Sequence, residues 1–189
     1  MSLKSDKKIF TTIEVAQKCG MNYQIVSRWF NRYRIQFPWK PEQKVSLDEF
    51  VEFINKSLPV ENEKKPKRPS VLIVDDEENV ANSISRVFQC NGFDILLAEN
   101  GFKAAILAKK EVPQIITIDL SMNGLDGYDV VSIIQKLKVR QKAWIIIISG
   151  SSHDSCERAV EMGADFYLQK PFSKTDLEKI IWRVCPKSA

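Results

Sequence analysis

Histidine and paired cysteines are scarce in this sequence, and long apolar runs are missing. His153 is the single histidine, which excludes a metal site built from several imidazoles. The cysteines at positions 19, 90, 156 and 185 form no C-x-x-C pair, which argues against a zinc site or a disulfide framework. No apolar run approaches the roughly 18 residues of a membrane span, and the first ten residues, MSLKSDKKIF, lack a signal peptide's apolar core. We therefore expect a soluble, cytoplasmic protein with no membrane partner.

The charge of the chain is divided unevenly along its length. Residues 1–68 contain 14 basic residues against 8 acidic ones, a net charge of +6, whereas residues 69–189 contain 14 against 16, a net charge of −2. The basic N-terminal part favours an anionic partner, with nucleic acid foremost.

A polar segment with three prolines, SLPVENEKKPKRPS, lies between two differently patterned parts of the chain. Its composition is typical of a linker, because it can neither continue a helix nor pack a strand. We expect a mostly helical domain over residues 1–56, a linker over 57–69 and a second domain over 70–189.

Three helical patterns precede the linker. The first begins with the capping box Thr11-x-x-Glu14 and ends at Gly20, and the third begins with the capping box Ser46-x-x-Glu49. The second lies in MNYQIVSRWFNRY, and its expected apolar stripe consists of Ile25, Val26, Trp29 and Phe30. The segment RIQFPWKPEQKV, with two prolines, leaves room for a small β-wing before the third helix.

After the linker, five short apolar runs alternate with helical patterns. The runs are residues 71–74, 95–98, 114–118, 144–149 and 165–168, and the helical patterns lie near 79–90, 100–111, 128–139, 154–162 and 174–184. Continuous apolar runs are typical of strands covered on both faces. This alternation predicts an α/β fold with a five-stranded, doubly wound parallel sheet.

Polar residues follow the ends of these predicted strands. In a sheet of order 2-1-3-4-5, ligands bind at the carboxyl ends of the strands, between strands 1 and 3. Asp75 and Asp76 follow the first run and Asp119 the third, so three carboxylates would share one crevice. Such a cluster needs a positive partner, and oxygen ligands suit Mg²⁺. Ser149 and Lys170, at the last two strand ends, complete the groups needed to phosphorylate an aspartate.

Taken singly, each of these residues has an ordinary structural interpretation. An aspartate before a helix usually caps it, an aspartate after a strand often begins a turn, and a lysine is usually solvated. Agreement among five residues at four strand ends on one site favours the phosphoryl site.

Four segments, VLIVDDEE, IDLSMNGLDG, IIIISG and GADFYLQKPF, resemble the receiver domain of bacterial two-component response regulators over roughly residues 70–185. The resemblance implies that Asp119 is the phospho-acceptor. It also implies that Mg²⁺ is held by Asp75, Asp76, the Asp119 carboxylate and the backbone carbonyl of Ser121.

The same resemblance assigns roles near the last two strands. Ser149 and Lys170 would contact the phosphoryl oxygens, Tyr167 would be an aromatic switch residue, and the Lys170–Pro171 peptide bond would be cis. Asn123 stands where the family usually has proline.

The first two helical patterns, joined through KCGMN, are typical of a helix-turn-helix, whose second helix enters the DNA major groove. The stretch of about residues 9–55 resembles the MerR/excisionase-type winged helix-turn-helix, although its expected wing contains no glycine. The predicted contacts to double-stranded DNA are Tyr23, Gln24, Ser27, Arg28, Arg32, Lys40 and Lys44.

These patterns together favour a DNA-binding response regulator rather than a turnover enzyme. A sensor histidine kinase would phosphorylate Asp119, and phosphorylation would change the surface of the fourth helix, fifth strand and fifth helix of the receiver. That surface would then form a homodimer or release the N-terminal domain to control transcription.

Two other functions remain open. In a phospho-gated signalling scaffold, the N-terminal domain would bind a protein instead of DNA. A phosphatase of the haloacid-dehalogenase type would also use a strand-end aspartate, but its general acid position is here Ser121 and no cap insertion is visible.

Overall fold

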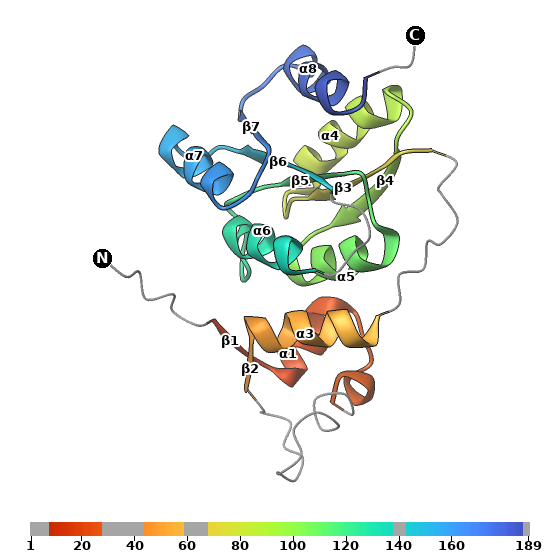
Figure 1. Ribbon diagram of the computed structural model, residues 1–189, viewed down its shortest axis with the longest axis vertical. Coiled ribbons are helices and arrows are strands. Elements are labelled where there is room, and N and C mark those ends of the chain that lie inside the picture. The colour runs from red at the N-terminus through yellow and green to blue at the C-terminus, as the bar shows by residue number, and fades with distance from the viewer. Residues whose placement is uncertain (1–7, 28–43, 59–67, 138–142, 187–189) are drawn as a thin grey trace.

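The structure of the protein is a computed structural model that describes residues 8–27, 44–58, 68–137 and 143–186. Its larger part is a five-stranded sheet with helices on both faces, and its smaller part is an N-terminal module of short helices and a two-stranded sheet (Figure 1). No helix within these four segments is both long and apolar enough to cross a membrane.

The large sheet is parallel throughout. Its strands are β3 (Ser70–Val74), β4 (Asp94–Ala98), β5 (Ile115–Ile118), β6 (Trp144–Ser149) and β7 (Phe166–Gln169), in the order β4-β3-β5-β6-β7. This is the predicted order 2-1-3-4-5, and each strand begins and ends within one residue of the apolar run that predicts it. Strands β3 and β5 are buried along their whole length, because helices cover both faces of the sheet.

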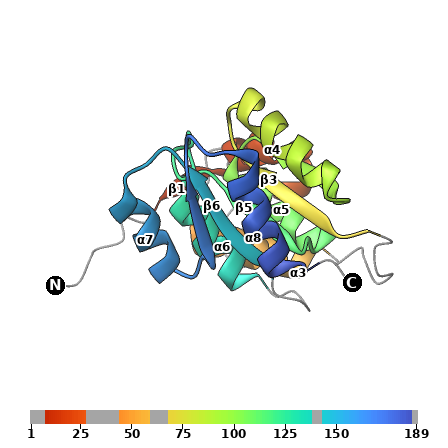
Figure 2. The same ribbon diagram turned by 90° about the horizontal axis from the view of Figure 1, so that it is seen from above.

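Five helices alternate with these strands. They are α4 (Glu78–Cys90), α5 (Gly101–Glu111), α6 (Gly127–Lys136), α7 (His153–Glu161) and α8 (Lys174–Val184). Val71 and Ile73 of β3 face a core shared with α4 and α8, the face seen from above in Figure 2. Leu72 and Val74 point to the opposite face, toward α5 and α6. This alternation along one strand separates the two apolar cores.

The N-terminal module contains β1 (Ile9–Thr11), α1 (Thr12–Cys19), a helical segment at 23–27, β2 (Lys44–Ser46) and α3 (Leu47–Ser57). Strands β1 and β2 pair antiparallel, and β1 was not predicted. Both predicted capping boxes are confirmed, at the starts of α1 and α3. Gly20 ends α1 with φ of 63°, a left-handed conformation that glycine adopts without steric cost.

The second helix, at residues 23–27, buries a different face from the one that the sequence predicts. Ile25 is 56% exposed, whereas Val26 and Ser27 are 0% and 6% exposed. The prediction of Ile25 as core and Ser27 as an outward residue is therefore wrong. Two adjacent apolar residues leave the rotation of a short helix ambiguous, and here the inward face is centred on Val26 and Ser27. Trp29 and Phe30 lie outside the described residues.

The N-terminal module packs against α5 and α6 of the larger domain, as the red and orange elements in Figure 1 show. The buried side chains of both parts form one continuous apolar cluster. Polar contacts extend it, because Lys136 Nζ lies 2.8 Å from Asp48 Oδ1 and Asn55 donates to the Lys136 carbonyl. The two parts are therefore in direct contact.

Candidate functional site

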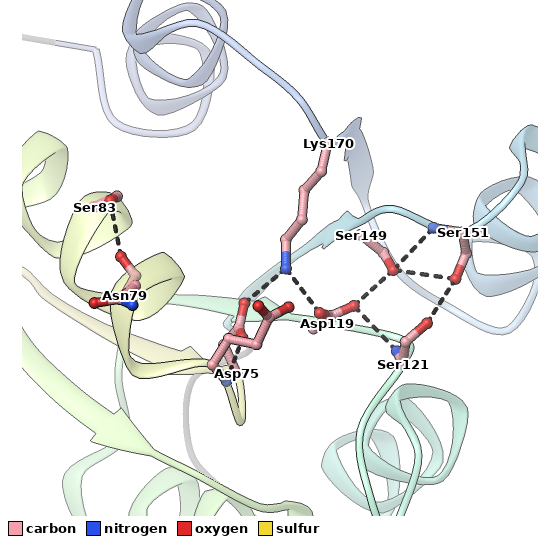
Figure 3. Close-up of polar contacts among 9 residues, drawn as sticks. Asp75, Asn79, Ser83, Asp119, Ser121, Ser149, Ser151 and Lys170 are labelled. Atoms are coloured by element: carbon pink, nitrogen blue, oxygen red, sulfur yellow. Dashed lines mark hydrogen bonds and ion pairs between the residues drawn. The ribbon is translucent and has the colours of Figure 1, made fainter.

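The carboxyl ends of β3, β5, β6 and β7 bring four predicted site residues together. Lys170 Nζ donates to Asp75 Oδ2 at 2.9 Å and to Asp119 Oδ2 at 2.7 Å, and Ser149 Oγ donates to Asp119 Oδ1 at 2.6 Å (Figure 3). The Lys170–Pro171 bond that precedes α8 is cis, as predicted. The site lies at the switch point between β3 and β5, where an α/β sheet of this order binds its ligands.

The two central carboxylates are almost fully buried and differ in protonation behaviour. Asp75 and Asp119 are each 4% exposed. Burial raises the pKa of Asp75 by more than the hydrogen bond from Lys170 lowers it. Burial opposes ionisation of Asp119 too, but hydrogen bonds from Lys170 and Ser149 outweigh it and hold the pKa of this carboxyl below its usual value. The pKa values of the two carboxyls are therefore shifted in opposite directions, and that of Asp119 is shifted toward the ionised form.

Lys170 supplies the positive charge of this pocket. Burial works to lower the pKa of its ammonium, but hydrogen bonds to Asp119 and Asp75 raise it above its usual value. The ammonium therefore stays protonated while it neutralises two acids, and it can turn toward an anion that arrives at Asp119.

A row of hydroxyl groups lies on the other side of Asp119. The backbone N–H of Ser121 donates to Asp119 Oδ1 at 3.0 Å. The hydroxyl of Ser151 lies 3.1 Å from those of both Ser121 and Ser149. Both oxygens of Asp119 therefore have hydrogen-bond donors, and these donors match the acceptor-rich oxygens of a phosphoryl group.

One group of carboxylates fits a divalent cation. Among the described residues, Asp75, Glu77 and Asp119 each offer an oxygen within 4.8 Å of the others, and oxygen-only donors of high charge suit Mg²⁺. Sequence reasoning missed Glu77, although it directly follows the predicted acidic pair. The predicted ligand Asp76 is not in this group, and its Oδ2 accepts hydrogen bonds from Asn123 N at 3.3 Å and Asn123 Nδ2 at 3.4 Å.

The predicted switch residue Tyr167 is held by a residue that sequence reasoning gave no role. Its hydroxyl lies 3.0 Å from Nδ1 of His153, the first residue of α7. The two rings meet edge to face with centroids 5.5 Å apart. The sequence does place His153 four positions after the site residue Ser149. It does not show that the His153 side chain points toward Tyr167.

The predicted DNA contacts are only partly described by the structure. Gln24 and Lys44 are exposed, and Tyr23 is half-buried against the core of the module. Ser27 is buried, so the prediction that it faces DNA is wrong for the same rotation of the helix that exposes Ile25. Arg28, Arg32 and Lys40 lie outside the described residues.

Comparison with known proteins identifies the larger domain. Residues 71–182, more than half of the chain, match the response regulator receiver domain family. The chain therefore belongs to this family, in agreement with the buried aspartate and its lysine and serine partners.

Individual relatives cover the same part of the chain. A probable transcriptional regulator ycf27 of Porphyra purpurea is 34% identical over 63% of this chain and 46% of the relative. The solved receiver domain of a response regulator from Bermanella marisrubri is 37% identical, with a TM-score of 0.57 over 61% of this chain and 96% of that structure.

A solved CheX–CheY–BeF3–Mg complex of Borrelia burgdorferi is 27% identical, with a TM-score of 0.58 over 63% of this chain and 90% of that structure. The chain spans about half the length of the curated relatives that it matches.

Proposed function

We propose that the protein is a two-component response regulator in which Asp119 accepts a phosphoryl group from a sensor histidine kinase. The observation that carries the proposal is the Asp119 carboxylate itself, which is buried and within 2.7 Å of Lys170 and 2.6 Å of Ser149. Relatives named as transcriptional regulators support an output at the level of transcription.

The residues present can carry out the transfer. A carboxylate oxygen of Asp119 attacks phosphorus, the bond from phosphorus to the donor's imidazole nitrogen breaks, and the electron pair stays on that nitrogen. The lowered pKa of Asp119 keeps the nucleophile ionised at neutral pH. Lys170 and Ser149 then turn their donors from the carboxylate to the phosphoryl oxygens. These roles describe one phosphorylation event per chain, and we expect no enzymatic turnover of other substrates.

Asp75, Glu77 and Asp119 are the residues that would hold Mg²⁺. A bound Mg²⁺ supplies positive charge to the oxygens of the transferring group. The solved CheX–CheY–BeF3–Mg complex contains Mg²⁺ and supports the choice of this ion. Asp76 and the Ser121 carbonyl, which the family resemblance implies as ligands, belong to the same proposal.

Phosphorylation of Asp119 is tested with acetyl phosphate and Mg²⁺, followed by intact mass measurement. The wild-type chain should gain the mass of one phosphoryl group, and Asp119→Asn should gain none. Asp94→Asn, at the exposed start of β4, is the matched control and should behave like the wild type. A modified Asp119→Asn chain would refute the assignment.

The N-terminal module is proposed to bind double-stranded DNA, with Gln24 and Lys44 as exposed contacts and Tyr23 beside them. Phosphorylated chains would pair so that two modules bind paired half-sites. A gel-shift assay over a salt series tests this, because phosphate contacts weaken steeply as salt rises.

A protein-binding scaffold is the second candidate, and one observation favours it. Ile25 is 56% exposed on the helix proposed for the groove, while Ser27 is buried. An exposed apolar residue at this position suits a protein surface better than DNA. Failure of the chain to shift any duplex at low salt, with or without phosphorylation, would support the scaffold over the DNA-binding regulator.

A further inference from the structure

The segment between β5 and α6 is held at its start by the acidic site. Ser121 N donates to Asp119 Oδ1 at 3.0 Å, and Asn123 N donates to Asp76 Oδ2 at 3.3 Å. Both acceptor oxygens belong to carboxylates with proposed roles in phosphorylation or metal binding. Any group that recruits these oxygens therefore competes with the segment for them.

The same segment is held at its end by the N-terminal module. Lys8 Nζ lies 2.8 Å from Asp126 Oδ2, contacts Asp129 Oδ2 at 2.5 Å and lies 3.5 Å from the Gly124 carbonyl oxygen. Asp126 and Asp129 form the capping box of α6. Lys18 of α1 also lies over this segment, with Nζ 3.1 Å from the position that a Cβ on Gly124 would take. A basic pair of the module thus lies on the turn that follows Asp119.

The two ends of the segment are mechanically connected. A Cβ on Gly127 would lie 2.4 Å from the Asp119 carbonyl oxygen, and Gly127 N donates to the Leu120 carbonyl at 3.2 Å. The first turn of α6 therefore rests directly on the backbone of the phospho-acceptor. Because packed interiors are nearly incompressible, a shift of that backbone is passed to Asp126 and Asp129.

An apolar surface holds the module in place beside this ionic contact. Helix α5 is buried toward the sheet and also toward the module, with Phe102 1%, Ala104 0% and Ala105 0% exposed. Phe102 packs edge-on against Phe10 and Phe50 of the module. Release of the module would expose this surface to water, so a released form would be a state distinct from the docked form.

We propose that Lys8 latches the N-terminal module to residues 124–129, and that phosphorylation of Asp119 weakens the latch. This inference rests on the proposed phosphorylation. A phosphoryl group and its metal ion take up the oxygens of Asp119 and Asp76, so Ser121 N and Asn123 N lose their hydrogen-bond acceptors. The segment between β5 and α6 then relaxes. As a result, Asp126 and Asp129 move relative to Lys8. The face of the receiver that senses phosphorylation is then formed by α5 and α6, which differs from the predicted surface of α7, β7 and α8.

The strength of the latch can be tested by measuring phosphorylation, because docking and phosphorylation are thermodynamically linked. If phosphorylation weakens docking, then docking must oppose phosphorylation by the same free energy. Because the undocked chain is the form that phosphorylation favours, Lys8→Ala should populate it more and should be phosphorylated about fivefold faster than the wild type with acetyl phosphate and Mg²⁺. Lys103→Ala is the matched control, because Lys103 is also a lysine of an ion pair but contacts Glu99 within the receiver.

The full chain provides a second readout. Amide hydrogen exchange in α1, α3 and α5 should become faster when the wild type is phosphorylated, and the unphosphorylated Lys8→Ala chain should already show part of this increase. Asp129→Asn neutralises one of the two carboxylates that contact Lys8 and should shift both measurements in the same direction as Lys8→Ala.

The outcomes separate this inference from the proposed function. The latch would be overturned, and the receiver function left intact, by the following result. All chains are phosphorylated, Lys8→Ala and the wild type react at equal rates, and amide exchange in α1, α3 and α5 does not change. Slower phosphorylation of Lys8→Ala would also overturn it, since Lys8 would then merely attract the anionic donor. A wild-type chain that gains no phosphoryl group would overturn both proposals.

Discussion

Phe102 of the receiver domain lies between Phe10 and Phe50 of the N-terminal module, with ring centroids 4.9 Å from each. The interplanar angles of 86° and 63° are those of edge-to-face aromatic pairs, the favoured geometry for aromatic rings. One receiver side chain therefore joins a strand and a helix of the module, and the two parts share their apolar core at this point.

Phe102→Ala should destabilise the whole chain rather than the receiver alone. The change leaves a cavity where three rings meet, and we expect a loss of about 3 kcal/mol in the free energy of unfolding. Urea unfolding, followed by circular dichroism, measures this. Leu97→Ala, at a 43% exposed position of β4, is the control and should cost less than about 1 kcal/mol. Equal losses for the two variants would contradict the structural role of Phe102.

The sequence predicts the elements of the fold better than their contacts. Continuous apolar runs identify all five strands of the large parallel sheet, and the Thr11 and Ser46 capping boxes identify two helix starts, because these signals are local. The docking of the module on α5 was not predicted, since periodicity shows which face is apolar but not what covers it. The run GFKAAILAKKE held a signal, because a helix with apolar residues on several sides is usually buried on several sides.

In the candidate site, too, the sequence predicts which residues come together better than it predicts their side-chain contacts. Strand ends place Asp75, Asp119, Ser149 and Lys170 together because the fold fixes where strands end. Side-chain direction is not fixed in this way, so the position of the Glu77 carboxylate near Asp75 and Asp119 and the contact between Asp76 and Asn123 could not be predicted.

Lys170→Met should destabilise the protein in a pH-dependent manner. In the wild type, the lowered pKa of Asp119 contributes stability above the unfolded-state pKa, and this contribution is lost as pH falls through the folded value. Without the ammonium, burial would raise the pKa of Asp119 instead, so the ionised carboxylate would cost stability at neutral pH. We expect a loss of about 3 kcal/mol near pH 7 that shrinks as pH falls below about 5.

Urea titrations of the wild type and Lys170→Met at several pH values measure this difference. The raised pKa of Lys170 has no effect in this range, because stability from a raised lysine pKa is lost only as pH rises through the folded value. A gap in unfolding free energy that stays constant between pH 7 and the acid limit would show that Lys170 acts through packing alone. Lys174→Met, in the exposed first turn of α8, serves as the control.

His153→Ala should make the receiver easier to phosphorylate. The bond from Tyr167 to His153 fixes the ring of the proposed switch residue, and a hydrogen bond of this kind contributes about 1 kcal/mol. Its loss favours the conformation in which Tyr167 has left this position, so the phosphorylation rate with acetyl phosphate should rise about threefold to fivefold. Tyr167→Phe keeps the ring and removes only the hydroxyl, so it should give the same increase. Opposite effects of the two substitutions would rule out this bond as the restraint.

Asp75→Asn should stabilise the metal-free protein while weakening Mg²⁺ binding. The raised pKa of Asp75 means that its ionised form costs stability above the unfolded-state pKa, so the neutral amide should increase the free energy of unfolding at pH 7. Mg²⁺ affinity, measured by calorimetry, should fall at least about tenfold, because a buried carboxylate ligand is lost.

The same calorimetric titration on Glu77→Gln and Asp76→Asn distinguishes two candidate ligands. Glu77 is the carboxylate that lies near Asp119 in the structure, and Asp76 is the ligand implied by the family resemblance. If Glu77 is a ligand, Glu77→Gln should weaken Mg²⁺ binding as Asp75→Asn does. Full affinity in Glu77→Gln together with loss in Asp76→Asn would mean that Asp76 leaves Asn123 to bind the ion.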